Sequence, residues 1–474
     1  MVVGDISTGT DVLVIGAGPG GYVAAIRAGQ LDLDVTLVEK DAYGGVCLNR
    51  GCIPSKALVT SAGLVHEAGH AETMGVHADP EVDMEAMIDW KDGVVDQLTG
   101  GVEKLCKANG VNLIEGRAEF RDDSSARIIH DSDGQGAETI EFEHAIIATG
   151  SRPIEVPGFE YDADPIMDSA AALAMTDVPD RLVVIGAGYI GMELSTVFAK
   201  LGADVTVVEM LDDALPGYED DVARIVRKRA EELGVEFHFG QAASEWTERD
   251  GGVVAVTEDE DGETYEHAAE KILVAVGREP VTDTLNLGAT GLTTDENGFI
   301  PTDDRARTDV DHIFAVGDVA GEPMLAHKGS KEGHVAADVI AGEPAALDYQ
   351  AIPAAVFTDP EIGTVGMTEA DAEEAGFSPV VGEFPFRASG RALTTGHDEG
   401  FVRLVADEEA GFVLGAQIVG PEASELIGEV GLAIEMGATL EDIESTIHTH
   451  PTLSEAVMEA AANARGQAIH TLNR

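Results

Sequence analysis

An internal repeat constrains the fold of this chain more than any other feature of its sequence. Asp11–Gly21 reads DVLVIGAGPGG, and Arg181–Gly191 reads RLVVIGAGYIG. Each copy has a short apolar run that predicts a buried strand, then a glycine-rich turn, then a helical pattern. In both copies an acidic residue follows the first glycine by 23 positions, at Glu39 and Glu209. Two copies with the same spacing predict two dinucleotide-binding domains.

The glycines of such a motif have separate tasks. The first permits a tight strand-to-helix turn, the second lets the backbone approach a pyrophosphate, and the third lets the helix pack against the sheet. Free N–H groups at the positive end of the helix would then bind the pyrophosphate. The candidate glycines are Gly16, Gly18 and Gly21 in the first copy and Gly186, Gly188 and Gly191 in the second.

The acid in the second copy indicates which nucleotide binds there. Glu39 and Glu209 are each expected to accept hydrogen bonds from a ribose diol. A carboxylate at Glu209 would repel the 2′-phosphate of NADP, and residues 210–213, which read MLDD, contain no arginine to offset that repulsion. The second copy is therefore predicted to bind NAD.

Further patterns extend the predicted architecture. The two copies close on similar strands and turns, Ala145–Pro153 and Ile272–Pro280. The loops Asp131–Gly134 and Asp259–Gly262 have turn chemistry and predict a β-hairpin insertion in each nucleotide-binding domain. From about Ala351 the pattern changes to strands and two helices, which predicts a domain of another kind.

The composition is strongly acidic. The chain has 29 Lys and Arg against 88 Asp and Glu, for a formal net charge of −59. Such a chain could not neutralise phosphates, which argues against nucleic acid as a partner. We interpret the acidity as adaptation to high salt, where the Debye length shortens to about 3 Å and repulsion between like charges is tolerable.

No segment predicts insertion into a membrane or export. No apolar run reaches the roughly 20 residues that a membrane span needs. Residues 1–10 lack the basic-then-apolar pattern of a signal peptide, so we expect a cytoplasmic protein. Three cysteines among 474 residues are too few for a structural disulfide framework.

Two of these cysteines lie close together, in the segment GGVCLNRGCIPSK of residues 44–56. In a regular helix, residues five apart have Cα atoms roughly 8–9 Å apart, whereas a disulfide needs less than about 7 Å. If Cys47 and Cys52 bond, the helix must be distorted between them, and Gly51 gives the backbone that freedom. A disulfide closing so small a loop stabilises little, which favours a redox role. Cys106 is interpreted as a core residue.

The cysteine segment resembles the signature of the pyridine nucleotide-disulfide oxidoreductases, and within them that of the dihydrolipoamide dehydrogenases. Arg50 departs from this signature, because the family more often has an apolar residue there. The resemblance covers essentially the whole chain, and beyond the cysteines and the glycine repeats it rests on Thr149-Gly150, Gly317-Asp318, Met324–Lys328 and His448–Glu455.

The resemblance implies an α/β fold with two Rossmann-like dinucleotide-binding domains, for FAD and NAD, and a C-terminal α+β dimerisation domain. The expected segments are 1–150 for the FAD-binding domain with the redox cysteines, 151–280 for the NAD-binding domain, 281–350 for a second, central part of the FAD-binding domain, and 351–474 for the dimerisation domain.

The resemblance also implies residue roles. Cys52 would lie against the flavin, and Cys47 would exchange with the substrate sulfur. Lys56 would approach the flavin ring with Glu193 as its ion partner, because a buried lysine needs one. The other residues expected to bind FAD are Gly16, Gly18, Gly21, Glu39, Thr149, Gly150, Gly317, Asp318, Ala326 and His327; those expected to bind NAD are Gly186, Gly188, Gly191, Glu209 and Gly277; no metal is expected.

The C-terminal segment HPTLSE supplies a candidate base. Thiol–disulfide exchange requires a thiolate, so a base must take the proton of an incoming dithiol. His450 is that candidate, with Glu455 fixing its tautomer, whereas His448 is interpreted as structural. Pro451 makes a cis His450–Pro451 bond plausible. In the family this base reaches the disulfide of a neighbouring subunit, which implies a homodimer.

The expected reaction is oxidation of protein-bound dihydrolipoamide through Cys47–Cys52 and FAD to NAD. The partner would be the lipoyl-bearing acyltransferase of a 2-oxoacid dehydrogenase complex or a glycine-cleavage carrier. Among relatives, a glutathione reductase would want arginines after Glu209, a mercuric reductase a C-terminal cysteine pair, and a transhydrogenase would lack Cys47 and Cys52. A docking subunit with a vestigial redox site is the alternative from another class, and the intact set with His450 and Glu455 argues against it.

Overall fold

The computed structural model describes residues 7–130, 136–161, 164–249 and 252–473. Its first sheet has parallel strands in the order β3-β2-β1-β6, and β17 pairs with the carboxyl end of β6. An antiparallel extension, β5 and then β4, pairs with the amino end of β6. These strands are β1 (Ser7–Ile15), β2 (Val35–Glu39), β3 (Asn112–Glu115), β4 (Arg117–Phe120), β5 (Ser125–Ile129), β6 (Ala137–Ile147) and β17 (Ile313–Ala315).

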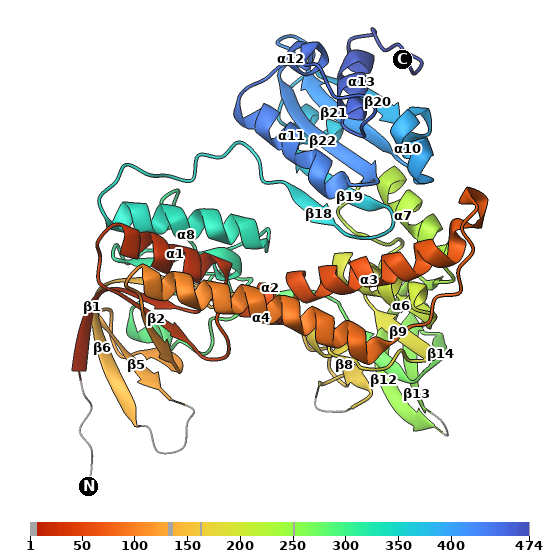
Figure 1. Ribbon diagram of the computed structural model, residues 1–474. Helices are drawn as coiled ribbons and strands as arrows, with labels where there is room; N and C mark the ends of the chain where they lie inside the picture. Colours follow the sequence, from red (N-terminus) through yellow and green to blue (C-terminus); the bar gives the residue numbers. More distant parts are fainter. Residues whose placement is uncertain (1–6, 131–135, 162–163, 250–251, 474) are drawn as a thin grey trace.

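Two helices lie side by side on this sheet, α1 (Pro19–Gln30) and α8 (Ala326–Ile340) (Figure 1). Glycines allow the close approach, since a Cβ on Gly333 would come within 2.2 Å of the Gly20 carbonyl oxygen. The chain continues from β2 through α2 (Gly45–Arg50) into two long helices, α3 (Cys52–His70) and α4 (Met84–Ala108), which contact each other. No helix in the described ranges is long and apolar enough to cross a membrane.

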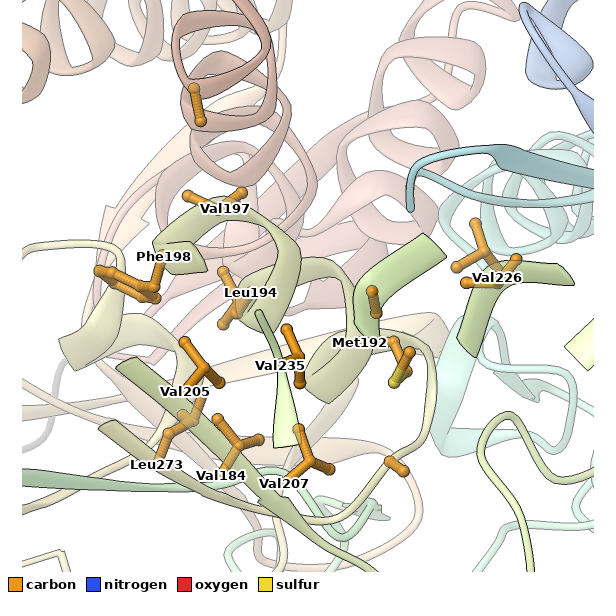
Figure 2. Close-up of a cluster of buried hydrophobic side chains, with 14 of the residues drawn as sticks. Val184, Met192, Leu194, Val197, Phe198, Val205, Val207, Val226, Val235 and Leu273 are labelled. Carbon is orange, nitrogen blue, oxygen red and sulfur yellow. The ribbon is translucent and has the colours of Figure 1, made fainter. Parts of the chain in front are cut away.

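The second sheet is parallel throughout, in the order β11-β10-β9-β15-β8. Figure 2 shows its packing: Val184, Val207 and Leu273 from the strands face Leu194 and Phe198 of α6. All five side chains are at most 2% exposed. The elements are β8 (Ile166–Met167), β9 (Arg181–Ile185), β10 (Asp204–Val208), β11 (Glu236–His238), β15 (Lys271–Val274), α5 (Ser169–Ala172), α6 (Tyr189–Lys200) and α7 (Asp220–Glu232).

An antiparallel meander interrupts the second repeat, with β12 (Gln241–Arg249), β13 (Gly252–Asp259) and β14 (Thr264–Ala269). The predicted hairpin at Asp259–Gly262 is confirmed, because β13 and β14 pair across it. The other predicted turn, Asp131–Gly134, lies outside the described residues. Two short strands, β7 (Ser151–Pro153) and β16 (Arg278–Pro280), pair where the two repeats meet.

The C-terminal part has an antiparallel sheet in the order β18-β19-β22-β21-β20. The sequence pattern predicted two helices here, whereas the described residues form five. Two of the additional helices, α9 and α12, have six residues each and begin at capping boxes, of Thr368 with Asp371 and of Thr439 with Asp442. The elements are β18 (Ala354–Val356), β19 (Glu361–Gly366), β20 (Pro379–Pro385), β21 (Phe401–Asp407), β22 (Val413–Gly420), α9 (Glu369–Glu374), α10 (Gly390–Thr395), α11 (Ala423–Glu435), α12 (Leu440–Ser445) and α13 (Glu455–Ala464).

Candidate active site

A cavity of about 440 Å³ lies at the carboxyl ends of β1 and β6, where the first sheet meets α2, α3 and α6. Most of the residues that the sequence analysis assigned to FAD binding, or to catalysis next to FAD, line this cavity. Those at its wall are Gly16, Gly18, Glu39, Cys47, Cys52, Lys56, Thr149, Gly150, Glu193, Gly317, Asp318 and Ala326. His327 does not line it, and its Nε2 lies 2.7 Å from the Pro353 carbonyl oxygen.

The glycines have the geometry that their predicted tasks require. Gly16 has φ +98°, and a Cβ there would lie 2.4 Å from the Ala148 carbonyl oxygen. A Cβ on Gly21 would lie 1.8 Å from the Gly16 carbonyl oxygen, so the helix can start close to the turn only with glycine. Gly18 has open space beside it and lines the cavity, where a pyrophosphate could approach its backbone.

The second repeat reproduces this turn. Gly186 has φ +102°, and a Cβ on Gly191 would lie 2.0 Å from the Gly186 carbonyl oxygen. Gly188 has open space beside it, as Gly18 does. Gly277, with φ +139°, lies between β15 and β16. The two repeats therefore build the same kind of glycine turn at a helix start.

Glu39 and Glu209 have a task that sequence reasoning missed. Glu39 accepts the Ala17 N–H at 2.7 Å, and Glu209 accepts the Ala187 N–H at the same distance. Each carboxylate therefore fixes the glycine turn of its own repeat. Because a carboxylate oxygen has two lone pairs, both acids can still accept hydrogen bonds from a ribose diol.

The helix between the cysteines is broken, as the disulfide distance argument required. Cys47 lies in α2 and Cys52 is the first residue of α3, with Gly51 between the helices at φ −140° and ψ −110°. Both cysteines are free in the structure, and both line the cavity. Cys52 is exposed to the cavity, whereas Cys47 is partly buried and Cys106 is buried in α4.

The two thiols differ in acidity. The hydrogen bond from Cys47 and the nearby charge of Lys56 lower the pKa of Cys52 to about 7, although burial opposes the change. The same hydrogen bond and burial raise the pKa of Cys47 well above its usual range. The charge of Lys56 next to Cys52 favours a thiolate there, and a thiol with a lowered pKa leaves more readily when its disulfide is attacked.

Lys56 lies one helical turn beyond Cys52, and its ion pair is the predicted one. Its Nζ is 2.7 Å from Glu193 Oε2 and 4.4 Å from the centre of the Phe357 ring. Glu193 is buried on α6 and also accepts the Phe357 N–H at 2.8 Å. This contact joins three parts of the chain: the cysteine helix, the second glycine repeat and the segment before β19.

The turn after β17 is held by an ion pair that the sequence analysis did not identify. Glu332 of α8 accepts the Gly317 N–H at 2.7 Å through Oε2, and its Oε1 lies 2.9 Å from Lys328 Nζ. Both side chains are buried. Asp318, which lines the cavity, accepts a hydrogen bond from the Ser151 hydroxyl. The i, i+4 spacing of Lys328 and Glu332 is a weak signal that could have indicated the pair.

Two further cavity residues were not assigned a role by sequence reasoning. Arg50 forms an ion pair with Asp41 at 2.6 Å, so the family departure at position 50 has a partner on the loop after β2. Tyr189 follows Gly188 at the start of α6, lines the cavity and is 44% exposed. The second glycine turn therefore reaches the wall of the first cofactor's cavity.

His450 and Glu455 pair with each other away from this cavity. His450 Nδ1 lies 2.9 Å from Glu455 Oε1, and Oε2 of that carboxylate accepts the Thr452 N–H. The His450–Pro451 bond is cis, as predicted. The His450 side chain is 81% exposed, and neither residue lines the cavity. His448 is largely buried and bonded to Glu429, in accord with a structural role.

The residues present fit a flavin dinucleotide. The glycine turn at the start of α1, the acid Glu39, the thiol of Cys52 and the amine of Lys56 all line one cavity. The second glycine turn, with Glu209, repeats the combination of the first glycine turn and Glu39. Within the described residues, no cluster of His, Cys, Asp and Glu could hold a metal ion.

Comparison with known families agrees with this site. Residues 10–333 match the family model of the pyridine nucleotide-disulphide oxidoreductases, and residues 352–461 match the dimerisation domain of the same family. The chain therefore belongs to the pyridine nucleotide-disulphide oxidoreductases, with FAD and NAD as cofactors. The dimerisation domain supports a homodimer.

Particular relatives narrow the resemblance. Dihydrolipoyl dehydrogenase of Halobacterium salinarum is 74% identical over the full length of both chains, and that of Haloferax volcanii is 73% identical. Dihydrolipoyl dehydrogenase of Geobacillus stearothermophilus is 49% identical over the full length of both chains. The crystal structure of LpdA from Mycobacterium tuberculosis superposes with a TM-score of 0.89, at 28% identity over 95% of this chain and 99% of that one.

Proposed function

We propose that this protein is a dihydrolipoamide dehydrogenase that oxidises a lipoyl dithiol through Cys47 and Cys52. The observation that carries the proposal is the pair of thiols at the cavity wall, Cys47 and Cys52, on either side of a helix break and next to the Lys56–Glu193 ion pair. The full-length relatives named dihydrolipoyl dehydrogenase support the choice of substrate. FAD, when bound, accepts the electron pair from the reduced cysteines and passes it to NAD.

In the exchange, a substrate thiolate attacks the Cys47 sulfur of the disulfide and forms a mixed disulfide, and Cys52 leaves as a thiolate. The second substrate thiolate then attacks the substrate sulfur bound to Cys47. The cyclic disulfide product forms and Cys47 leaves. Lys56 stabilises the Cys52 thiolate by its charge, and Glu193 holds Lys56 in place. The substrate is oxidised by two electrons, and the disulfide is reduced.

His450 takes the proton of the incoming thiol, with Glu455 orienting the ring through Nδ1 so that Nε2 can act as the base. The exposure of His450 supports a site completed by a second subunit, since the imidazole does not line the cavity of its own chain. The remaining assignments stand as part of the proposal: the FAD and NAD residues named from the sequence, and the segments 1–150, 151–280, 281–350 and 351–474.

The partner follows from the substrate. The lipoyl group would be carried by the acyltransferase of a 2-oxoacid dehydrogenase complex or by a glycine-cleavage carrier. We place the enzyme in the cytoplasm, where a reducing environment keeps non-catalytic thiols such as Cys106 free.

The activity test compares two substrate pairs, dihydrolipoamide with NAD and glutathione disulfide with NADPH. We expect turnover only of the first pair, and turnover of the second in its place would refute the substrate assignment. The trans arrangement is tested by co-assembling inactive His450→Gln subunits with inactive Cys47→Ser subunits. A heterodimer would have one site with both native groups, so random pairing should restore about a quarter of the native activity. A site built within one chain would stay inactive.

A further inference from the structure

The structure brings an arginine to the loop that follows Glu209, although residues 210–213 contain none. Arg227 lies on α7, and its Nη1 is 2.7 Å from Asp213 Oδ1. Arg227 Nε also lies 3.8 Å from Oε1 of Glu231, which is on the same helix. The guanidinium carbon is also 5.7 Å from the centre of the Phe239 ring. Arg227 is therefore held against this loop from outside it.

The loop that Arg227 contacts is the one that Glu209 organises. Glu209 Oε1 accepts the Leu211 N–H at 2.9 Å, and the Leu211 carbonyl accepts the Gly240 N–H at 3.2 Å. Asp213 Oδ1 also accepts the N–H of Ala214 at 2.7 Å. Glu209 and Asp213 therefore lie on one short, hydrogen-bonded segment, and Arg227 of α7 pairs with Asp213 on that segment.

This arrangement bears on the choice between NAD and NADP. A 2′-phosphate next to Glu209 would carry up to two negative charges and would need a cation, and an arginine fork is well suited to that task. Arg227 carries the charge that a phosphate needs and contacts the loop after Glu209, but its charge is already matched by Asp213. Part of the pair is exposed, at 27% for Arg227 and 40% for Asp213, so a phosphate could compete for the guanidinium if Asp213 were neutral.

We propose that Asp213 is a second determinant of NAD specificity, because its ion pair keeps Arg227 from binding the 2′-phosphate of NADP. Glu209 repels the phosphate directly, and Asp213 occupies the nearby arginine that could otherwise attract it. The inference rests on the assignment of Glu209 to the adenosine ribose of NAD in the proposed function. Asp213 acts through Arg227 and is a positioning residue, not a catalytic one.

The loop offers a matched control for this mechanism. Asp212 carries the same charge one residue earlier, and no ion pair joins it to Arg227 in the structure. Asp213→Asn removes the charge but keeps an oxygen that can accept the Ala214 N–H. Asp212→Asn removes an equal charge and leaves the Asp213–Arg227 pair intact. The two variants separate release of Arg227 from a general loss of negative charge.

The experiment measures binding of 5′-ADP and of 2′,5′-ADP to the FAD-loaded enzyme by calorimetry, at one fixed salt concentration that retains the flavin. The variants are built on Glu209→Gln, which removes the negative charge but keeps an amide oxygen that can accept the Ala187 N–H. Adding Asp213→Asn should tighten binding of 2′,5′-ADP by roughly tenfold relative to 5′-ADP. Adding Arg227→Gln to that double variant should abolish this gain in 2′,5′-ADP binding. The ratio of kcat/KM with NADP to kcat/KM with NAD should rise in the double variant and fall again in the triple variant.

Two results would overturn the proposal. One is an equal gain from Asp212→Asn, because charge removal alone would then explain the effect. The other is a gain that persists after Arg227→Gln. A failure of the underlying assignment gives a different signature: Glu209→Gln would then change neither the affinity for 5′-ADP nor that for 2′,5′-ADP, before Asp213 is altered at all.

Discussion

Cys47→Ala should raise the pKa of Cys52 from about 7 toward its ordinary value of 9.0, since it removes the hydrogen bond that lowers this pKa most. A hydrogen bond to a charged group contributes about 1.5–3 kcal/mol, and one pKa unit corresponds to 1.36 kcal/mol. The bond is therefore strong enough to account for the whole lowering. At pH 7 the thiolate fraction of Cys52 should fall from about one half to about one hundredth.

Cys47→Ser is the matched control, because its hydroxyl can still donate a hydrogen bond to the Cys52 sulfur. The assay is the rate of alkylation of Cys52 by iodoacetamide between pH 5 and pH 10, followed by mass spectrometry of its peptide. Only the thiolate reacts, so the rate rises as pH passes the pKa. The reasoning is refuted if Cys47→Ala titrates near pH 7 together with Cys47→Ser.

Three further predictions concern stability. Glu193→Gln should lower the free energy of unfolding by about 2–4 kcal/mol, because Lys56 loses its charged partner. In denaturant titrations, Lys56→Met should then lower this free energy less in the Glu193→Gln variant than in the native chain. Fully additive losses would contradict the pairing. Arg403→Met should destabilise the enzyme by about 3 kcal/mol, because Glu219, Asp221 and Glu383 all pair with this largely buried arginine. Molar salt should recover part of the loss, because it screens the repulsion between the three carboxylates that remain. A loss independent of salt would argue against this repulsion. Dilution from about 2 M to about 0.05 M salt should release flavin and dissociate or unfold the native enzyme, because the net charge of −59 is no longer screened. Flavin fluorescence would follow the release, and sedimentation would follow the dissociation. Equal stability at both salt concentrations would refute adaptation to salt.

Local patterns predicted the nucleotide-binding folds well because their constraints are local. Gly21 and Gly191 each contact the first glycine of their own turn, five residues earlier, and Gly16 and Gly186 have positive φ values that favour glycine, so the sequence alone identified both turns. The C-terminal part was predicted less well. Helices of six residues, such as the one that begins after Thr368, are too short for hydrophobic periodicity and depend on capping instead.

The candidate site divides in the same way. The break between Cys47 and Cys52 follows from helix geometry and from Gly51, so it could be predicted. The pairs Glu332 with the Gly317 N–H and Asp213 with Arg227 join different elements, and only the folded chain shows them. The same holds for Arg50, whose partner Asp41 lies on the loop after β2.

The distribution of charge explains how so acidic a chain can bind anionic cofactors. The whole chain has 29 basic and 88 acidic side chains, whereas the cavity wall has six Lys and Arg against five Asp and Glu. In molar salt the Debye length is about 3 Å, so distant surface carboxylates contribute little at the cavity. Binding there is expected to depend on contacts of hydrogen-bond length, such as those from the free N–H groups at the start of α1. The acidity that keeps the surface compatible with salt is thus separated from the site by screening and by local pairing.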